Sequence, residues 1–411
     1  MGGAGGSGVA TLVTVAADIM SGVVSTKSIL KSPSMEVQVN GEKLIKRSFK
    51  IICFFLLVLA RAVSSQNARC PFQYLYHFGD GFTDIGNSIH VRPFGSSNPA
   101  SRLPYGITTP GRPTGRWSDG LVDFDYASTD FGLPHITPYL SMNVSASYDG
   151  VIFSVARSPV LDRRFFASRG VRIPSYAISL SIQLNWFKKY LTSICSTQTD
   201  CATRLENSLL LMGDIEGNDI GYPLAQGKSI EEVRNYVPYV IRAIINGTRM
   251  LIRMGAKLII IPGNAPLGCY PYILTALPSN DSTAYDDLGC LKSVNNLILS
   301  KNNDLQQAMD ELRKEFPNVT INYGPNGELA LKACCGIGGK YNYDSSRFCG
   351  SPGVPVCPYP NQYIYWDGLH MTNLAYSRVA TLLIKPSLVT LNCSSQSSAF
   401  MWPITDSVQS M

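Results

Sequence analysis

Short continuous apolar runs alternate along this chain with longer stretches in which apolar residues recur every three or four positions. The sequence predicts four β-strands, Gln73–Phe78, Ser208–Met212, Lys257–Ile261 and Val319–Tyr323. Ser208–Met212 and Lys257–Ile261 are apolar runs typical of buried strands. The longer stretches predict three helices: Val233–Met254, Leu291–Phe316 and Leu374–Ile384. Pro238 is compatible with the first of these helices only near its start.

Apolar strands separated by helices are typical of a parallel sheet that is covered on both faces. The pattern therefore predicts a three-layer α/β/α fold with a central parallel sheet. In such sheets the chemistry gathers in loops beyond the carboxyl ends of the strands. We expect those loops after Phe78, after Met212 and after Ile261.

The chain has 411 residues, of which 45% are hydrophobic and 16% charged, which is enough to build one large core. No repeat or low-complexity linker follows Gln66. We therefore predict a single domain over residues 66–411.

A secretory signal is predicted within residues 35–65. The basic residues at 43–50 precede the apolar stretch Ile51–Ala60, and Ala62–Ser65 supplies small residues for cleavage. The apolar stretch is too short to span a bilayer stably, although a buried core helix remains an alternative. Residues 1–34 form an N-terminal extension of unknown role. We expect a protein that is secreted, or delivered to the vacuole through the secretory pathway.

Cysteines and glycosylation sequons agree with export. Outside the signal segment ten cysteines remain, and an even number in a secreted chain suggests disulfides, with Cys195/Cys201 and Cys349/Cys357 as candidate pairs. No histidine lies near them at ligand spacing, so we expect no metal and no other cofactor. Five asparagines begin Asn-x-Ser/Thr sequons: Asn143, Asn246, Asn280, Asn318 and Asn392.

The formal charge of +6 does not indicate a nucleic-acid partner. Residues 1–65 hold seven Lys/Arg against three acids, so most of the excess lies there, and the remainder has no basic run. The high aromatic content, with 21 Tyr and 16 Phe, suits instead a globular protein with an apolar pocket. The motifs described below imply that its small-molecule ligand carries a carbonyl or an ester.

Several motifs in order carry a resemblance over about Cys70–Ser387. They are Phe78–Asn87, Pro104–Gly106, Pro113–Gly120, Gly213–Asp219, Pro266–Pro271, Ala333–Gly336 and Trp366–His370. Together they resemble the plant GDSL esterase/lipase family of the SGNH-hydrolase fold. The Cys349–Pro355 stretch most resembles the branch with sinapine-esterase and acetylajmalan-esterase relatives. The resemblance also implies that the adjacent Cys334 and Cys335 are structural disulfide cysteines.

The resemblance implies a nucleophilic serine at position 81, in a turn supported by Asp80. It implies that His370 takes the serine proton and that Asp367 orients the imidazole. Asn218 matches the side-chain donor to the oxyanion. An Asp-x-x-His pair alone would favour a surface salt bridge; within this ordered set it predicts an active site.

Two positions depart from the family pattern. Gly81 stands where the serine belongs, so a backbone N–H remains but no hydroxyl. Arg157 stands where a glycine donates its N–H to the oxyanion, and its side chain could point outward, fill the pocket or bind an anion. Three hydroxyls lie close in sequence to family motifs without matching the nucleophile: Thr83, Ser88 and Ser154. The other histidines, His77, His90 and His135, have no motif context, and we expect His77 to pack in or beside its strand.

Three functions remain open. The favoured one is an acid–base enzyme that performs isomerisation, cyclisation or elimination on a small plant metabolite, with its carbonyl polarised by Asn218, Gly81 and Arg157. The second is residual ester hydrolysis with water as the nucleophile. The third is a binding protein without catalysis.

Overall fold

The central element is a parallel sheet in a computed structural model that describes residues 70–393, apart from 134–135, 144–145, 147, 214, 216 and 325–330. Its strand order is β2-β3-β1-β4-β5-β6, and every neighbouring pair is parallel. The strands are β1 Tyr74–Phe78, β2 Ile136–Pro138, β3 Gly150–Ile152, β4 Ser208–Met212, β5 Leu258–Pro262 and β6 Thr320–Gly324. The predicted signal and extension lie outside the described residues.

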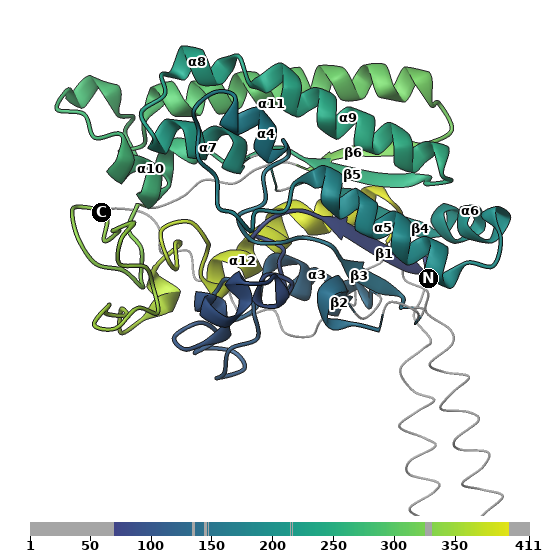
Figure 1. Cartoon of the computed structure of the whole chain (residues 1–411), viewed down its shortest axis with the longest axis horizontal. Helices are drawn as coiled ribbons and strands as arrows, with labels where there is room; N and C mark the ends of the chain where they lie inside the picture. Colours follow the sequence, from purple (N-terminus) through teal and green to yellow (C-terminus); the bar gives the residue numbers. More distant parts are fainter. Residues whose placement is uncertain are drawn as a thin grey trace, which may run out of the picture. The chain divides into compact units, whose positions relative to one another are not determined.

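Helices cover both faces of the sheet, as Figure 1 shows. Helices α5, α9 and α11 pack on one face, and α3, α12 and α13 pack on the other. The α-helices are α3 Asp123–Phe131, α4 Arg163–Ala167, α5 Leu180–Ile194, α6 Gln198–Glu206, α7 Gly217–Ala225, α8 Ile230–Arg234, α9 Val237–Arg253, α10 Pro271–Ala276, α11 Lys292–Glu315, α12 Asn373–Val379 and α13 Lys385–Thr390. The predicted three-layer α/β/α fold is confirmed.

Alternation along the strands builds two separate cores. In β4, Leu210 and Met212 face the α5/α9/α11 layer, whereas Leu209 and Leu211 face the α3/α12/α13 layer. All five residues of β4 are buried, which explains why this strand is a continuous apolar run in the sequence.

The four predicted strands are confirmed to within one residue at each end, but two of the helix predictions differ. The predicted helix Val233–Met254 is interrupted, and α9 restarts with Pro238 in its first turn, because proline lacks the N–H that a helix interior needs. The predicted last helix is α12, followed by one wide π-helical turn at Ala380–Ile384 and then α13. That turn precedes Pro386, whose ring would otherwise meet a carbonyl of the preceding turn.

Five disulfides join the ten cysteines. The Cys195–Cys201 pair is confirmed. The Cys349/Cys357 candidate is wrong, because Cys349 bonds to Cys335 and Cys357 bonds to Cys334. Adjacent cysteines thus cross-link to two different points of the following loop, an arrangement that sequence proximity does not suggest. The remaining pairs are Cys70–Cys393 and Cys269–Cys290.

Within the described part of the chain, no helix is both long enough and apolar enough to cross a membrane.

Candidate active site

A pocket of about 60 Å³ lies beyond the carboxyl ends of the strands. Its lining comes from the loops after β1, β3 and β5, from the starts of α7 and α10, and from the loop before α12. The lining residues are Asp80, Gly81, Phe82, Arg157, Gly217, Asn218, Asn264, Ala265, Leu267, Tyr270, Tyr272, Leu369 and His370. Pockets that enclose a whole drug-sized ligand measure about 300–1,000 Å³. This one therefore admits only a small group of a ligand.

His370 and Asp367 form a buried, hydrogen-bonded pair. Nδ1 of His370 lies 2.9 Å from Oδ2 and 3.1 Å from Oδ1 of Asp367. The same carboxylate accepts hydrogen bonds from the backbone N–H groups of Leu369 and His370, at 3.0 and 2.8 Å. These bonds fix both the plane of the ring and the tautomer that carries its proton on Nδ1.

Tyr105 completes this side of the site. Its hydroxyl donates a hydrogen bond of 2.7 Å to Oδ2 of Asp367. Burial, with the neighbouring charge of Asp367, raises the pKa of Tyr105 well above its usual value, so the phenol stays protonated. Burial alone would raise the pKa of Asp367 as well. The charge of His370 and the bonds from His370 and Tyr105 outweigh burial and lower that pKa, so Asp367 remains ionised.

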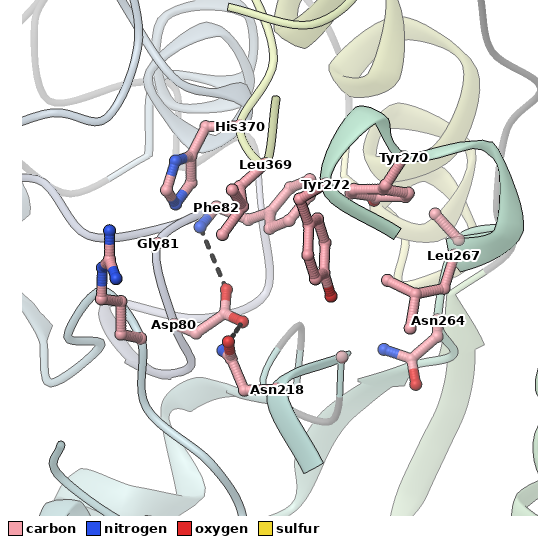
Figure 2. Close-up of a pocket in the computed structure, with 13 residues that line it drawn as sticks. Asp80, Gly81, Phe82, Asn218, Asn264, Leu267, Tyr270, Tyr272, Leu369 and His370 are labelled. Atoms are coloured by element: carbon pink, nitrogen blue, oxygen red, sulfur yellow. Dashed lines mark hydrogen bonds between the residues drawn. The ribbon is translucent and has the colours of Figure 1, made fainter. Parts of the chain in front are cut away.

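The imidazole of His370 occupies the space that a side chain at position 81 would fill. A Cβ atom placed with ideal geometry on Gly81 would overlap Nε2 of His370 and lie 2.7 Å from its Cδ2. Figure 2 shows the ring directed toward Gly81, with Asp80 and Asn218 on the far side of the turn. A serine at position 81 would require the imidazole to withdraw.

The turn itself is held by two carboxylates. Asp80 accepts hydrogen bonds from the backbone N–H of Phe82 and from Nδ2 of Asn218, at 3.1 and 2.8 Å (Figure 2). Asp84 is fully buried and accepts four backbone N–H groups, from Gly86, Asn87, Ser88 and Ala156. Asp84 thereby joins the β1 turn to the segment that leads into Arg157.

Arg157 lies in the pocket with an unusual backbone. Its φ is +68°, in the left-handed region that favours glycine and costs another residue about 1–2 kcal/mol. The hydroxyl of Tyr222 donates to its carbonyl at 2.8 Å. Its guanidinium carbon lies 5.7 Å from the ring centre of Trp117 and 4.8 Å from that of Phe348.

The three expected oxyanion donors differ in whether they are already hydrogen-bonded within the protein. Among the described residues, the backbone N–H groups of Gly81 and Arg157 donate to no protein acceptor. The two amide hydrogens of Asn218 are both engaged, with Asp80 at 2.8 Å and with the carbonyl of Ser158 at 2.9 Å. A ligand oxygen could thus be received at once by the two backbone groups, whereas Asn218 would have to exchange a bond.

Comparison with known proteins assigns the family. Residues 75–383 match the family described as GDSL-like Lipase/Acylhydrolase. The chain belongs to this family. It is 45% identical over 360 residues to the acetylajmalan esterase of Rauvolfia serpentina, covering 84% of this chain and 92% of that protein. It is 43% identical to acetylajmalan esterase 1 of the same plant, with 84% and 93% covered. A GDSL esterase/lipase of Arabidopsis thaliana is 36% identical, with 84% and 98% covered.

The three hydroxyls near the GDSL motifs are not in the pocket. Thr83 and Ser154 are buried and hydrogen-bond to each other at 2.8 Å. Ser88 is buried as well, and its oxygen accepts the indole N–H of Trp117 at 3.0 Å. Among the described residues that line the pocket there is no serine, threonine, cysteine or lysine.

The other histidines lie apart from this chemistry. His77 is buried in β1, its ring packs edge-on against Phe124, and neither ring nitrogen has a partner. Burial lowers the pKa of His77 to about 3, so the ring is neutral, and its expected packing is confirmed. His90 is exposed, and His135 lies outside the described residues.

Several residues that sequence reasoning assigned no role are part of the site. Tyr105 and Trp117 lie within motifs quoted for the family, and Trp117 contacts His370 with ring centres 4.9 Å apart. Tyr272 and Asn264 line the pocket opposite His370 (Figure 2). Their only signal in the sequence was membership of a motif or proximity to one.

Proposed function

We propose that this GDSL-family protein is a non-hydrolytic acid–base enzyme acting on a small plant metabolite that carries a carbonyl group. The reactions that fit are isomerisation, cyclisation and elimination. In each of them a proton leaves one atom of the ligand and a proton is returned to another, and no acyl group is transferred to the protein.

The observation that carries the proposal is the position of His370. Its Nε2 lies where the side chain of residue 81 would be, and no alcohol or thiol lines the described pocket. An esterase of this family needs a nucleophile between imidazole and substrate, whereas here the imidazole itself would meet the ligand. Asp367 would stabilise the imidazolium that forms when Nε2 takes a proton.

The remaining groups suit the same chemistry. The free N–H groups of Gly81 and Arg157 would bind a carbonyl oxygen and stabilise the negative charge that develops when a neighbouring C–H is deprotonated. Asn218 would assist by exchanging one of its present bonds. The pocket is small enough for a carbonyl and its neighbours to fill it and displace water.

The test is product formation by the purified protein. Small carbonyl-bearing metabolites are incubated in D₂O, and their products and deuterium content are read by mass spectrometry. We expect a new product with wild type, deuterated at carbon when the reaction is an isomerisation or a cyclisation, and neither product nor deuterium above background with His370→Ala. Deuterium incorporation that survives this substitution would contradict the proposal.

Ester hydrolysis by water is the second candidate, because the names of the relatives denote esterases and two oxyanion donors remain free. Loss of a triad serine typically costs about 10⁶ in turnover and leaves about 10³–10⁴ over water. Hydrolysis of p-nitrophenyl acetate by wild type, compared with His370→Ala, measures this activity. Saturable ligand binding without turnover, unchanged by His370→Ala, would identify the third function, a binding protein.

We also propose that the mature protein begins near Gln66, forms one domain and is secreted or vacuolar. The five disulfides support an oxidising compartment. All five sequon asparagines are exposed, which supports glycosylation at Asn143, Asn246, Asn280, Asn318 and Asn392. Peptide mapping of the plant-expressed protein, with and without removal of N-glycans, tests the start and the five sites together.

A further inference from the structure

The guanidinium of Arg157 has no hydrogen-bond or ion-pair partner among the described residues. Its Nε is buried and unsatisfied, and none of its five N–H groups donates to a protein oxygen. Arg157 is partly buried, and a buried N–H of a cation without an acceptor costs free energy, to which the positive φ of this residue adds. A ligand that supplies the missing acceptors would offset both.

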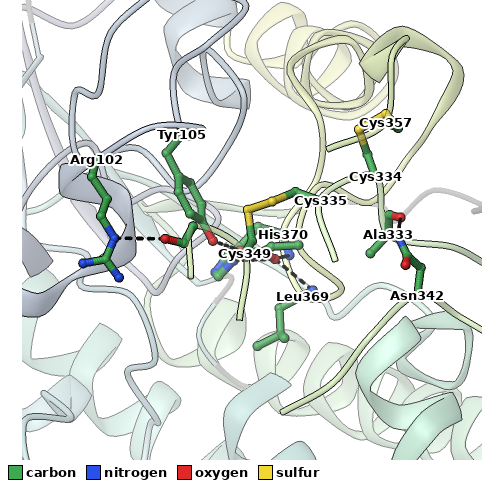
Figure 3. Close-up of a disulfide and its surroundings, with 12 residues drawn as sticks. Arg102, Tyr105, Ala333, Cys334, Cys335, Asn342, Cys349, Cys357, Leu369 and His370 are labelled. Carbon is green, nitrogen blue, oxygen red and sulfur yellow. Dashed lines mark hydrogen bonds and ion pairs between the residues drawn. A yellow bond between two sulfur atoms is a disulfide. The ribbon is translucent and has the colours of Figure 1, made fainter. Parts of the chain in front are cut away.

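Two aromatic rings hold the guanidinium in place. Trp117 is fully buried, and Phe348 precedes Cys349, which is bonded to Cys335. Figure 3 shows this disulfide beside Tyr105 and His370. The rings fix the position of the guanidinium but provide no oxygen for its N–H groups. Those N–H groups therefore remain available to a ligand.

The two carboxylates near the pocket are already engaged. Asp367 accepts bonds from Tyr105 and from the backbone and ring of His370. Asp80 accepts bonds from Phe82 and Asn218. Neither is ion-paired with Arg157, so the positive charge is not neutralised by a direct contact within the described site.

We infer that Arg157 binds a carboxylate of the ligand, so that the ligands of this pocket are small organic acids or their half-esters. A planar guanidinium matches a carboxylate with two parallel N–H···O bonds. Trp117 contacts both Arg157 and His370, at 5.7 and 4.9 Å from its ring centre, so these two groups are at most about 11 Å apart. One small molecule can therefore bind at Arg157 and present a reactive carbon to His370. The inference rests on the proposed function only in that both concern the same pocket.

The probes are phenylacetate and phenylacetamide, which share their shape and differ in charge. Binding to the full-length protein is followed by titration calorimetry. We expect wild type to bind the carboxylate at least tenfold more tightly than the amide. A preference below twofold in wild type would overturn the inference without reference to any variant.

Variants locate the preference. Arg157→Gln removes the charge, and we expect its preference to fall below threefold. Arg157→Gly fits the positive φ, and it gives the same readout if the glutamine variant does not fold. The matched control is Arg169→Gln, because Arg169 also stacks on an aromatic ring, Phe165 at 3.6 Å, but lies outside the pocket. The control keeps the tenfold preference; a preference retained in both Arg157 variants, or lost in the control, contradicts the assignment.

An inorganic anion is the competing occupant. Phosphate at millimolar concentration should leave the affinity for phenylacetate within twofold, and a loss of more than tenfold would show a general anion site and overturn the assignment to organic acids. Turnover and ligand preference, both measured in wild type, separate this inference from the proposed function. If wild type prefers the carboxylate but shows no turnover, the inference holds and the proposed function is wrong. If wild type shows turnover but no preference for the carboxylate, the proposed function holds and the inference is wrong.

Discussion

The two sides of the pocket differ in how far the protein satisfies its own polar groups. On the acid–base side, one Asp367 carboxylate receives four hydrogen-bond donors, including the imidazole and Tyr105. On the opposite side, two backbone N–H groups and the guanidinium of Arg157 have no protein acceptor in the described chain. The first side is already organised for proton transfer, and the second retains its capacity for a ligand.

In the proposed function, the two sides of the pocket have different roles. A saturated Asp–His pair is costly to alter, since each lost bond leaves a buried charge unpaired. The changed positions, Gly81 and Arg157, lie where the family's esterase chemistry would place the attacking hydroxyl and a close backbone approach. Under the proposed function, these two residues exclude acyl transfer and leave proton transfer available.

The largest expected effect comes from removing the imidazole. His370→Ala should reduce turnover of the proposed reaction by about 10²–10⁴, the usual contribution of a positioned acid or base. Asp367→Asn should cause a smaller loss, because the ring remains but its tautomer and charge are no longer fixed. Initial rates of deuterium incorporation measure both, and equal rates in wild type and His370→Ala would contradict the comparison.

The next largest effect tests whether substitutions at Gly81 and Arg157 can restore ester hydrolysis. Gly81→Ser alone should raise p-nitrophenyl acetate hydrolysis less than tenfold, since the new Cβ overlaps His370 and the Arg157 side chain still lines the pocket. Gly81→Ser with Arg157→Gly should raise it by about 10²–10³, a non-additive gain expected of residues that act as a unit. A full gain from Gly81→Ser alone would show that the Arg157 side chain does not restrict ester hydrolysis.

The disulfides offer a test of rigidity. Cys334 and Cys335 donate their N–H groups to the carbonyls of Tyr365 and Trp366, so their loop holds the segment that carries His370. Replacing Cys335 and Cys349 by serine should cost about 3 kcal/mol of unfolding free energy and lower turnover about tenfold.

The matched control is replacement of Cys195 and Cys201 by serine. This pair closes a loop with a sequence separation of 6, against 14 for Cys335–Cys349. It should cost about 2 kcal/mol and leave turnover unchanged. Denaturant unfolding and initial rates distinguish the two; equal losses of turnover would show that neither disulfide acts on the site.

The smallest effect concerns pH. The pKa of His77 is about 3 in the fold and near 6.5 when unfolded, so the unfolded chain binds the extra proton between these values. The contribution of neutral His77 to the free energy of unfolding is therefore complete above about pH 6.5. It falls as the pH falls, by about 2 kcal/mol between pH 7 and pH 5.

His77→Leu should remove this acid sensitivity, because both ring nitrogens lack partners and an apolar side chain leaves nothing unsatisfied. His90→Gln, which changes an exposed histidine, should retain it. Urea unfolding at pH 5 and pH 7 provides the check.

How much of the fold and of the site could be predicted from the sequence depends on the length of each strand or motif. The strands β1, β4, β5 and β6 have five residues each, long enough to be recognised, whereas β2 and β3 have three residues each and are not predicted from the sequence. The motifs placed Gly81, Asn218 and His370 around one pocket. They could not show that His370 fills the space at position 81, nor that Asn218 is bonded to Asp80, because both depend on side-chain positions.

Contacts between residues far apart in the sequence could not be predicted either. Tyr105 and Asp367 are separated by 262 residues, and the partner of Cys349 is Cys335 rather than the nearer Cys357. Such contacts follow from the packed fold, which local spacing does not encode.

The central claim is that this pocket transfers protons and forms no covalent acyl-enzyme. Its most direct test is incubation of the purified wild-type protein with a serine-directed fluorophosphonate, followed by intact-mass and peptide analysis, with Gly81→Ser/Arg157→Gly as the positive control. We predict a stoichiometric adduct at position 81 in the control and no adduct on any pocket residue of wild type. A stoichiometric adduct within the wild-type pocket would contradict the account.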